Sequence, residues 1–445
     1  MPRRITLKRV MRLKAVSIEK KLLKSILWVY IALCVVIAGL NYGLAPRADA
    51  RTAQFLTWFW HFYENWVKTA FILAASILTI RITGRSGRTA LRKMNLAGFI
   101  VAALVVHVAL PLVSGNYEWY FFTMPLPWTT TPLQLLDAGS AFRLSRFPVW
   151  GAAGVTGVLT FYAAATAFVA LGTLLFGRRL QCSMLCLFNG FAAEVFDPAI
   201  PLTGHRRKPG ARLIAALNIA CWGFLAAALL FTLWWLASLL GLTPTAARSA
   251  FSKAETYVYL AGELLMAMFF WVAFIGRGYC YYCPLGTVLS GLARLGGQRI
   301  ETQETHCIQC GRCTEVCPMA IDVKAAAIHG SPLHHSRCVG CGHCVDACPT
   351  KTLRYTTRFL ESVRRKRVLH PLYQKLLSRG KTDPAPSRRS VTGLVLHRNP
   401  ISRGKSGLRF RKSGRELGAA RRQRARIPRH ARPRSNPVVK DSLNT

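Results

Sequence analysis

Eight cysteines in the C-terminal half of this sequence have spacings that suit iron–sulfur chemistry. The first run, residues 307–317, reads CIQCGRCTEVC, and the second run, residues 338–348, reads CVGCGHCVDAC. A proline follows each run. Both are therefore C-x2-C-x2-C-x3-C-P, the pattern that binds iron–sulfur clusters in bacterial two-cluster ferredoxins. Two complete copies of the pattern predict two [4Fe–4S] clusters.

The last cysteine of each run is expected to bind the cluster of the other run, as it does in those ferredoxins. The first predicted ligand set, centre I, is Cys307, Cys310, Cys313 and Cys348. The second set, centre II, is Cys338, Cys341, Cys344 and Cys317. Zinc is a poorer explanation, because two C-x2-C pairs already satisfy a tetrahedral ion. Disulfides suit small secreted domains rather than a segment joined to membrane helices.

Four further cysteines, the membrane-side cysteines, form two close pairs that each follow a Gly-Arg dipeptide at the end of an apolar stretch. They are Cys182 and Cys186, and Cys280 and Cys283. The likeness of the two segments indicates a duplicated unit, so we expect all four thiols at one membrane surface, close to the clusters. Three roles stay open. These are a further metal centre, redox-active dithiols or a soft-metal site, and reduced cysteines that shape the contact between helices and clusters.

Three polar side chains within or near apolar segments are candidates for proton or cofactor chemistry. Glu263 is a candidate proton handler for a quinol, since intramembrane carboxylates are commonly functional. The alternative is a hydrogen bond from Glu263 to a neighbouring helix. His107 is a candidate haem or quinol ligand, with His61 as the possible second ligand. A satisfied buried histidine is the simpler interpretation of His107, and we expect no haem.

Long apolar segments must position these residues. A membrane helix has to cross a hydrocarbon layer about 30 Å thick. We predict about six spans: 25–45, 67–80 extended backwards over 58–66, 96–113, 152–176, 213–240 and 257–275.

Basic residues concentrate in alternate connecting segments. Segments 81–94 and 177–212 are basic, whereas 46–65, 115–150 and 241–255 carry only two Lys or Arg each. Because basic loops stay in the cytoplasm, this alternation predicts a multi-pass protein of the inner (cytoplasmic) membrane with both termini in the cytoplasm. The cysteine runs would then face a reducing compartment.

The first span could instead be a cleaved signal peptide, because Ala48-Asp49-Ala50 resembles a signal-peptidase site. Its apolar core is longer than the roughly 7–15 residues of a signal peptide. We therefore expect an uncleaved anchor, and removal of this span would not change the side on which the clusters lie.

The chain divides into four parts by composition. They are a basic N-terminus (1–24), a transmembrane domain (25–290), the cluster module (291–357) and a basic tail (358–445). The tail is rich in Arg, Ser, Pro and Gly without sustained apolar periodicity, which predicts disorder. Attraction to anionic lipids is its plausible secondary role. We expect no specific nucleic-acid binding, and no glycine fingerprint indicates a nicotinamide site.

Over approximately residues 150–350 the chain resembles a known family. Membrane helices with Gly-Arg-preceded cysteine pairs, followed by a two-cluster ferredoxin module, are similar to the NapH family of quinol dehydrogenase subunits, to MauN-type proteins and to the membrane half of NosR-type proteins. The best-matched residues are the two cysteine runs and Gly276-Arg277-x2-Cys280-x2-Cys283-Pro284-Leu285-Gly286. Family members usually carry C-x3-C-P at both pairs, whereas here the first pair is followed by Leu187 and only the second by proline. We expect no covalent flavin, because no flavin-attachment segment of the NosR type precedes the helices.

These features together predict an α-helical membrane protein with a C-terminal two-cluster, bacterial-ferredoxin-like α+β module and a disordered basic tail. The leading hypothesis is a relay of electrons between the quinone pool and a separate reductase or maturation protein. The alternative is an accessory protein for metallocentre assembly, which uses cluster electrons to reduce a metal or disulfide at the membrane-side cysteines. A redox sensor is a third possibility. An electron carrier is the safer description, and a quinol dehydrogenase subunit is the more specific one.

Overall fold

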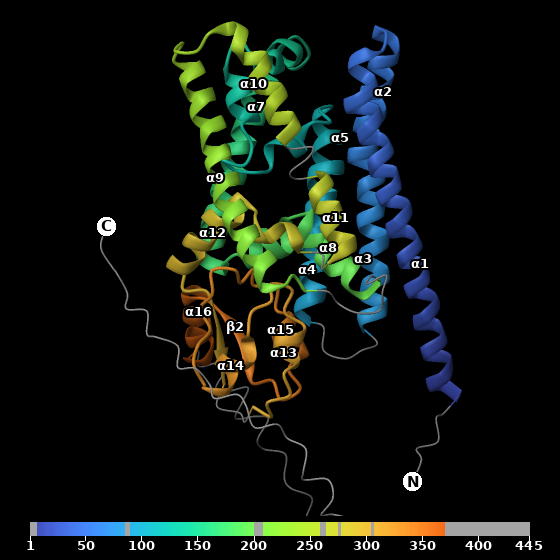
Figure 1. The fold of residues 1–445 in the computed structure, drawn as a ribbon, viewed down its shortest axis with the longest axis vertical. Helices are drawn as coiled ribbons and strands as arrows, with labels where there is room; N and C mark the ends of the chain where they lie inside the picture. The colour runs from blue at the N-terminus through green and yellow to red at the C-terminus, as the bar shows by residue number, and fades with distance from the viewer. Residues whose placement is uncertain are drawn as a thin grey trace, which may run out of the picture. The chain divides into compact units, whose positions relative to one another are not determined.

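Long helices dominate the structure, and five of them are apolar and long enough to cross a membrane. The computed structural model describes residues 7–84, 90–199, 208–258, 264–274, 277–303 and 307–369, all within one unit of the chain, residues 1–380 (Figure 1). The five spans found among these residues are Ala15–Arg47, Ala50–Gly84, Ala90–Ser114, Ala141–Phe176 and Ala211–Leu239. The chain is therefore a membrane protein, as its sequence predicts.

The first three spans each combine α-helix with one π-helical turn. The first consists of α1 (Leu7–Ala38), η1 (Gly39–Leu44) and η2 (Ala45–Arg47). The second consists of α2 (Ala50–Phe62), η3 (Tyr63–Val67) and α3 (Lys68–Gly84). The third consists of α4 (Ala90–Leu104), η4 (Val105–Ala109) and α5 (Leu110–Ser114). Ala48-Asp49-Ala50 forms the turn between the first two spans, where the Asp49 carboxylate accepts the Thr52 N–H at 3.2 Å and caps α2.

The remaining two spans are single helices, α7 (Ala141–Phe176) and α9 (Ala211–Leu239). Helix α7 is bent at Gly151, which has a φ of 64° and a ψ of −178°. The predicted span starts at residue 152, whereas the helix begins at Ala141, before the bend. Turns of α7 on both sides of the bend pack with η5 (Trp119–Phe122) and α6 (Thr131–Leu136) around a small apolar core.

The sixth predicted span, 257–275, includes residues 259–263 and 275, which lie outside the described residues. The described chain on either side forms α10 (Thr245–Val258) and α11 (Met266–Ala273). Both α10 and α11 are shown in Figure 1. The number of six spans stays a prediction.

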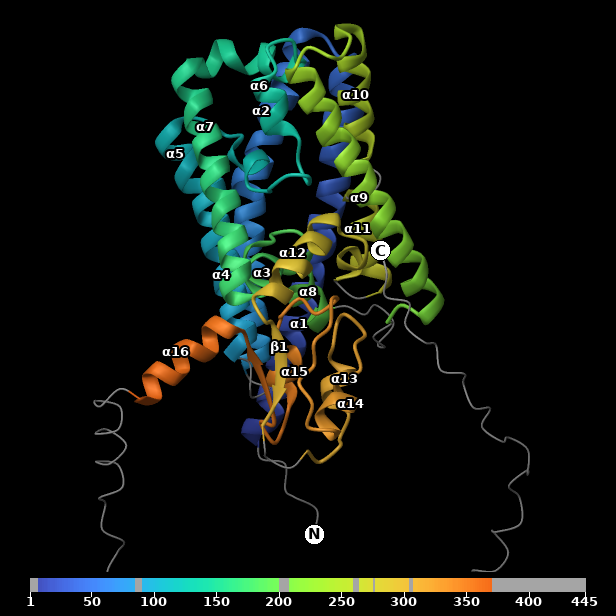
Figure 2. The same ribbon diagram turned by 90° about the vertical axis from the view of Figure 1, so that its left-hand side faces the viewer.

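A layer of short elements separates the long helices from the cluster module. It contains η6 (Gln181–Leu185), α8 (Asn189–Ala199), η8 (Gly278–Tyr281) and α12 (Pro284–Leu295). Figures 1 and 2 both show α8 and α12 at this level. The membrane-side cysteines lie in or beside this layer, at the inner ends of the spans, as the duplicated Gly-Arg segments predict.

The cluster module is a small α+β unit. Its elements are β1 (Arg299–Thr302), α13 (Arg312–Glu315), α14 (Val323–Ile328), α15 (His343–Ala347) and β2 (Leu353–Thr356). The two strands pair antiparallel, with Ile300 opposite Tyr355. One apolar core runs without interruption from the membrane helices into this module, so the module is part of the same packed body.

The expectation of disorder from residue 358 onward is wrong at the start of the tail. Residues Arg358–Leu369 form helix α16. The Phe359 ring packs edge-on against Phe176 at 5.5 Å, and Arg299 pairs with Glu361 at 2.6 Å. These contacts with distant parts of the chain stabilise a helix that local composition does not predict. Residues 370–445 lie outside the described residues.

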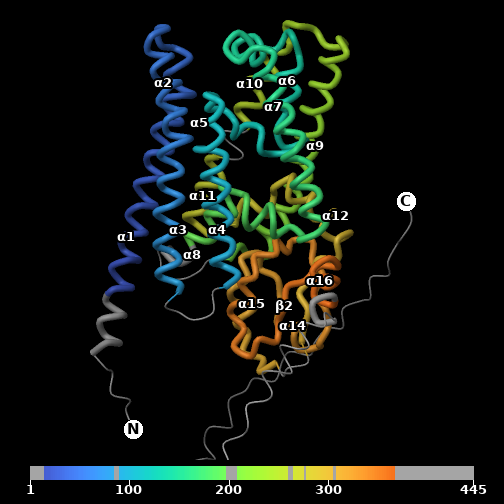
Figure 3. The backbone as a smooth tube through the Cα atoms, turned by 180° about the vertical axis from the view of Figure 1, so that it is seen from behind, coloured from blue at the N-terminus to red at the C-terminus, as the bar shows by residue number. Residues whose placement is uncertain are grey.

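The N-terminal end of α1 lies at the same end of the bundle as the cluster module (Figures 1 and 3). Arginines of both basic segments contact this end: Arg92 pairs with Glu194 at 2.9 Å, and the Arg178 guanidinium donates to the Ser336 carbonyl at 2.6 Å. This arrangement supports the predicted topology, in which the basic loops and the clusters share one side.

We predict that alkaline phosphatase fused after Gly115 or after Gly241 is active in cells, because both glycines lie at the opposite end of the bundle from the cluster module. The same enzyme fused after Gly84 or after Thr357 should be inactive, whereas a fluorescent reporter there should be bright. Alkaline phosphatase activity from the Thr357 fusion would contradict a cytoplasmic cluster module.

Candidate metal centres

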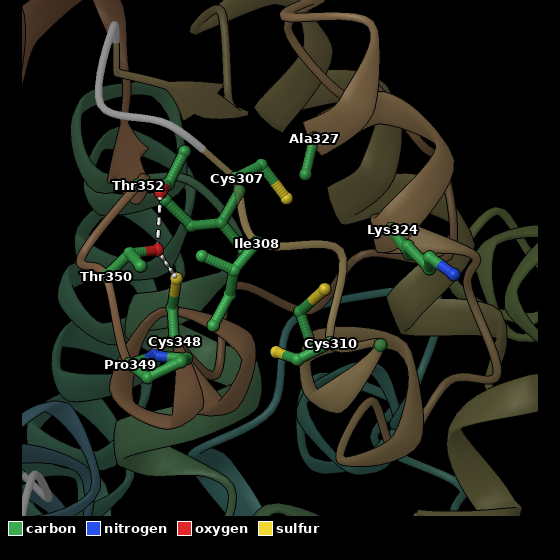
Figure 4. A pocket seen from close by; sticks show the side chains of 12 residues that line it. Cys307, Ile308, Cys310, Lys324, Ala327, Cys348, Pro349, Thr350 and Thr352 are labelled. Carbon is green, nitrogen blue, oxygen red and sulfur yellow. Dashed lines mark hydrogen bonds between the residues drawn. The ribbon is translucent and has the colours of Figure 1, made fainter. Parts of the chain in front are cut away.

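The four predicted ligands of centre I line one pocket. Cys307, Cys310 and Cys313 come from the first run, and Cys348 reaches the pocket from the second. Figure 4 shows the sulfur atoms of Cys307, Cys310 and Cys348 around this space. Ile308 and Ala327 add apolar side chains to the lining, and Lys324, Thr350 and Thr352 add polar ones. Four thiols around one pocket suit an iron–sulfur cluster, and the contribution from Cys348 supports the crossover assignment.

Centre I lies near the surface of the module. Cys310 is exposed and Cys307 is partly exposed. The Thr350 hydroxyl lies 3.5 Å from the Cys348 sulfur and 2.7 Å from the Thr352 hydroxyl (Figure 4). An exposed centre is accessible to a redox partner in solution.

The predicted ligands of centre II act on one another electrostatically. Burial raises the pKa of Cys341 to about 12, although Arg277 lowers it and Cys317 raises it further. Burial also raises the pKa values of Cys338 and Cys344, and Cys317 adds to both increases. Cys317 therefore lies among the second-run cysteines, as the crossover requires. Deprotonation of these buried thiols requires a compensating positive charge, which the irons of a bound cluster would supply.

Centre II faces the membrane helices and the short elements at their ends, because hydrogen bonds from both hold the loop that carries its ligands. The Asn95 amide of α4 donates to the Cys341 carbonyl at 2.9 Å, and the Ser183 hydroxyl of η6 donates to the Val339 carbonyl at 3.0 Å. The Gln298 amide donates to the Cys338 carbonyl at 2.8 Å. The loop around centre II is therefore held by three side chains from before the module's first strand.

A close backbone approach at Gly342 brings this loop against α4. Gly342 has a φ of 81°, and a Cβ atom there would lie 2.4 Å from the Leu91 side chain. Only glycine fits such a conformation and such a contact without strain. The following helix, α15, then directs Asp346 to the start of α4, where its carboxylate accepts the N–H groups of Leu91 and Arg92 at 3.0 and 3.1 Å. A carboxylate at a helix N-terminus is stabilising.

Glu194, a fully buried carboxylate on α8, completes the attachment. Both of its oxygens lie 2.9 Å from Nε2 of His343. In the sequence, His343 lies between two predicted ligands of centre II, Cys341 and Cys344. The Arg92 guanidinium lies 2.9 Å from one oxygen, and the Asn95 amide donates to the other at 3.1 Å. Burial alone would raise the pKa of Glu194, but His343 and Arg92 hold it well below the usual range. Glu194 therefore stays ionised and joins α4, α8 and the cluster module.

The structural role of Glu194 could not be predicted from the sequence. It is one of only two acids in the basic segment 177–212, and its spacing fits no motif. Its partners are distant in the chain, so only the fold reveals the network.

The membrane-side cysteines converge. Cys182 lies on η6 and Cys186 just before α8, whereas Cys280 lies on η8 and Cys283 is the N-cap of α12. Burial raises the pKa of Cys280 to about 11; Arg277 lowers it, and the thiolates of Cys186 and Cys182 raise it. Burial also raises the pKa of Cys283, with Cys280 as the next cause and smaller effects from the other two. All four side chains are partly accessible.

The two predicted histidines, His61 and His107, have other neighbours than these thiols. Glu263 lies outside the described residues, so its role stays a prediction. His107 is buried and stacks on Tyr120, with ring centres 5.8 Å apart. His61 instead lies 3.4 Å from the Glu118 carboxylate.

Comparison with known proteins identifies the module. Residues 299–358 match the family described as 4Fe-4S dicluster domain. This region is a 4Fe-4S dicluster domain. The match supports a ferredoxin-type iron–sulfur protein joined to membrane helices, and domains of this kind transfer electrons.

One similar protein has a name that states no function. An uncharacterized protein of Methanocaldococcus jannaschii is 36% identical over 67 residues, which are 15% of this chain and 27% of the relative. The match therefore spans about a quarter of that protein's length. No solved structure matches the chain.

The crossover assignment predicts which spectra change together. Cys348→Ser should alter the same electron paramagnetic resonance (EPR) signal as Cys307→Ser, because both residues belong to centre I. Cys317→Ser should instead alter the signal that Cys338→Ser alters. A Cys348→Ser spectrum that matches Cys338→Ser would contradict the assignment and favour clusters bound within each run.

Glu194→Gln should destabilise the attachment of the module, because it leaves Arg92 and His343 buried without a carboxylate. Removing one partner of a buried ion pair typically costs about 3–5 kcal/mol. Thermal unfolding should therefore occur at a clearly lower temperature, and loss of the cluster absorbance is the measurement that monitors it. Glu315→Gln is the control, since Glu315 is an exposed acid on the same module. Equal unfolding temperatures of the two variants would contradict the structural role of Glu194.

Proposed function

We propose that this protein relays electrons between the quinone pool of the inner membrane and a separate redox protein in the cytoplasm, as a quinol dehydrogenase subunit of the NapH type. The observation that carries the proposal is the position of the two cysteine sets, one beside the membrane helices and the other at the surface of the module. Centre II is held against the inner ends of the membrane helices, whereas centre I includes the exposed Cys310. Bound iron–sulfur clusters supply one-electron transfer.

The side chains around centre II suit exchange with a membrane carrier. Arg277 is fully buried and lies within electrostatic reach of Cys341, a ligand of centre II. A buried positive charge favours the more negative, reduced form of a neighbouring centre, so it raises the reduction potential. A higher potential brings such a centre closer to the range in which a quinol can donate electrons.

The rigid attachment of the module serves the same function. Asp346 caps α4 and Glu194 links α8 to the second run, so centre II stays at a fixed distance from the membrane helices. Fixed spacing suits electron transfer, because the protein's contribution is to position the cofactor. The partner in solution would meet the face that carries Cys310.

The relay predicts that a quinol analogue reduces the purified protein. Anaerobic full-length protein in detergent should lose cluster absorbance when menadiol is added, and should regain it with an oxidised quinone analogue. Heat-treated protein without clusters is the control for direct absorbance changes of the quinol. Clusters that dithionite reduces but that no quinol reduces would contradict direct exchange with the quinone pool.

A further inference from the structure

The membrane-side cysteines lie within one electrostatic neighbourhood, although about a hundred residues separate the two pairs. Each of Cys182 and Cys186 acts on both Cys280 and Cys283. Each of the four residues is partly exposed. Cys182 and Cys283 pack against the same small apolar cluster, so one cysteine of each pair lies in the same part of the fold.

Two buried arginines border this set. Arg277 is 0% exposed, and its Nη1 atom lies 2.8 Å from the Cys182 carbonyl and 4.0 Å from the Cys280 sulfur. Arg178 is 4% exposed, and a Cβ atom added at Gly286 would lie 2.8 Å from its Nη2 atom and 3.7 Å from the Cys283 sulfur. The two guanidinium groups thus approach the thiols from both halves of the duplicated unit.

These arginines have no carboxylate bonded to them among the ion pairs of the described residues, and the Nε atom of each lacks a hydrogen-bond partner there. Burying a guanidinium without a counter-charge is costly. Arg277 has the Glu194 carboxylate within electrostatic reach, and thiolates at Cys182, Cys280 and Cys283 would stabilise Arg178. Both guanidinium groups therefore suit a group of net negative charge at the four sulfurs.

The backbone also donates to these sulfurs. The Gly286 N–H donates to the Cys283 sulfur at 3.3 Å, at the start of α12. Backbone N–H groups that precede and begin α8 favour the thiolate of Cys186 in the same way, although burial opposes them. Each half thus directs one thiol to a helix N-terminus, where a negative sulfur is stabilised.

The number and type of these side chains suit an iron–sulfur cluster. Four thiolates are the ligand set of both [2Fe–2S] and [4Fe–4S] clusters.

We propose that Cys182, Cys186, Cys280 and Cys283 bind a third iron–sulfur cluster between the membrane helices and centre II. Arg178 and Arg277 offset its negative charge. The Ser183 hydroxyl bonds to Val339 in the second run and the Arg178 guanidinium to Ser336 just before it, so the site adjoins centre II. The inference deepens the proposed relay, since this site lies closer to the membrane than centre II, but its test requires no quinol.

The test is the iron and acid-labile sulfide content of full-length protein purified anaerobically in detergent. The unmodified protein should hold about ten or about twelve irons per chain, for a two-iron or a four-iron cluster beside the two in the module. Cys182→Ser combined with Cys280→Ser should lower the content to about eight, with the EPR signals of centres I and II retained.

Cys221→Ser is the matched control. Cys221 lies beside the site, with its sulfur 2.8 Å from the Thr287 hydroxyl, but it does not belong to the set. This variant should keep the iron content of the unmodified protein. About eight irons in an unmodified protein that shows both module signals would overturn the proposal, and so would zinc or copper bound at the four cysteines. The unmodified protein decides the question even where the double variant fails to accumulate.

Discussion

The structure depends on a buried carboxylate that joins the cluster module to the membrane helices. Glu194 has no exposed surface, and it meets His343 of the module and Arg92 of α4. An ionised carboxylate away from water is tolerated only where charged and polar partners surround it. Because Glu194 and those partners lie on three separate elements, the network forms only when module and helices are docked. Its geometry therefore fixes where centre II lies relative to the membrane.

The same physical constraint recurs at the membrane-side cysteines with the charges reversed. There, the buried groups are the guanidinium ions of Arg178 and Arg277, and the thiolates of the proposed cluster would compensate them together with Glu194. The two sites adjoin, because the loop of the second run contacts both η6 and α4. A continuous series of sulfur ligands thus extends from the inner ends of the helices to the exposed Cys310. This series supports an electron-transfer function, whichever partner exchanges electrons at each end.

The spacing of residues along the chain predicted those features that depend on local sequence. The two cysteine runs indicated the dicluster domain, and apolar length indicated the five spans, although the fourth begins at Ala141 and not at residue 152. The likeness of the two Gly-Arg segments indicated that four more cysteines would lie at one level. In each case the residues that carry the signal are neighbours in sequence.

Contacts between distant residues could not be predicted in this way. Helix α16 forms from a basic segment because Phe359 packs on Phe176 and Glu361 pairs with Arg299, more than 50 residues away. Glu194 and His343 are 149 residues apart, and neither belongs to a recognisable motif of acid and base. The partners of Arg178 likewise became visible only with the fold. Such pairings require the tertiary structure, because composition and periodicity carry no information about them.

Anaerobic cryo-electron microscopy of the full-length protein would test the central claim most directly. The account predicts cluster density between Cys307, Cys310, Cys313 and Cys348, and again between the second-run cysteines and Cys317, with the module docked on α4 and α8. Density for single zinc ions, clusters bound within each run, or a module separated from these helices would contradict it.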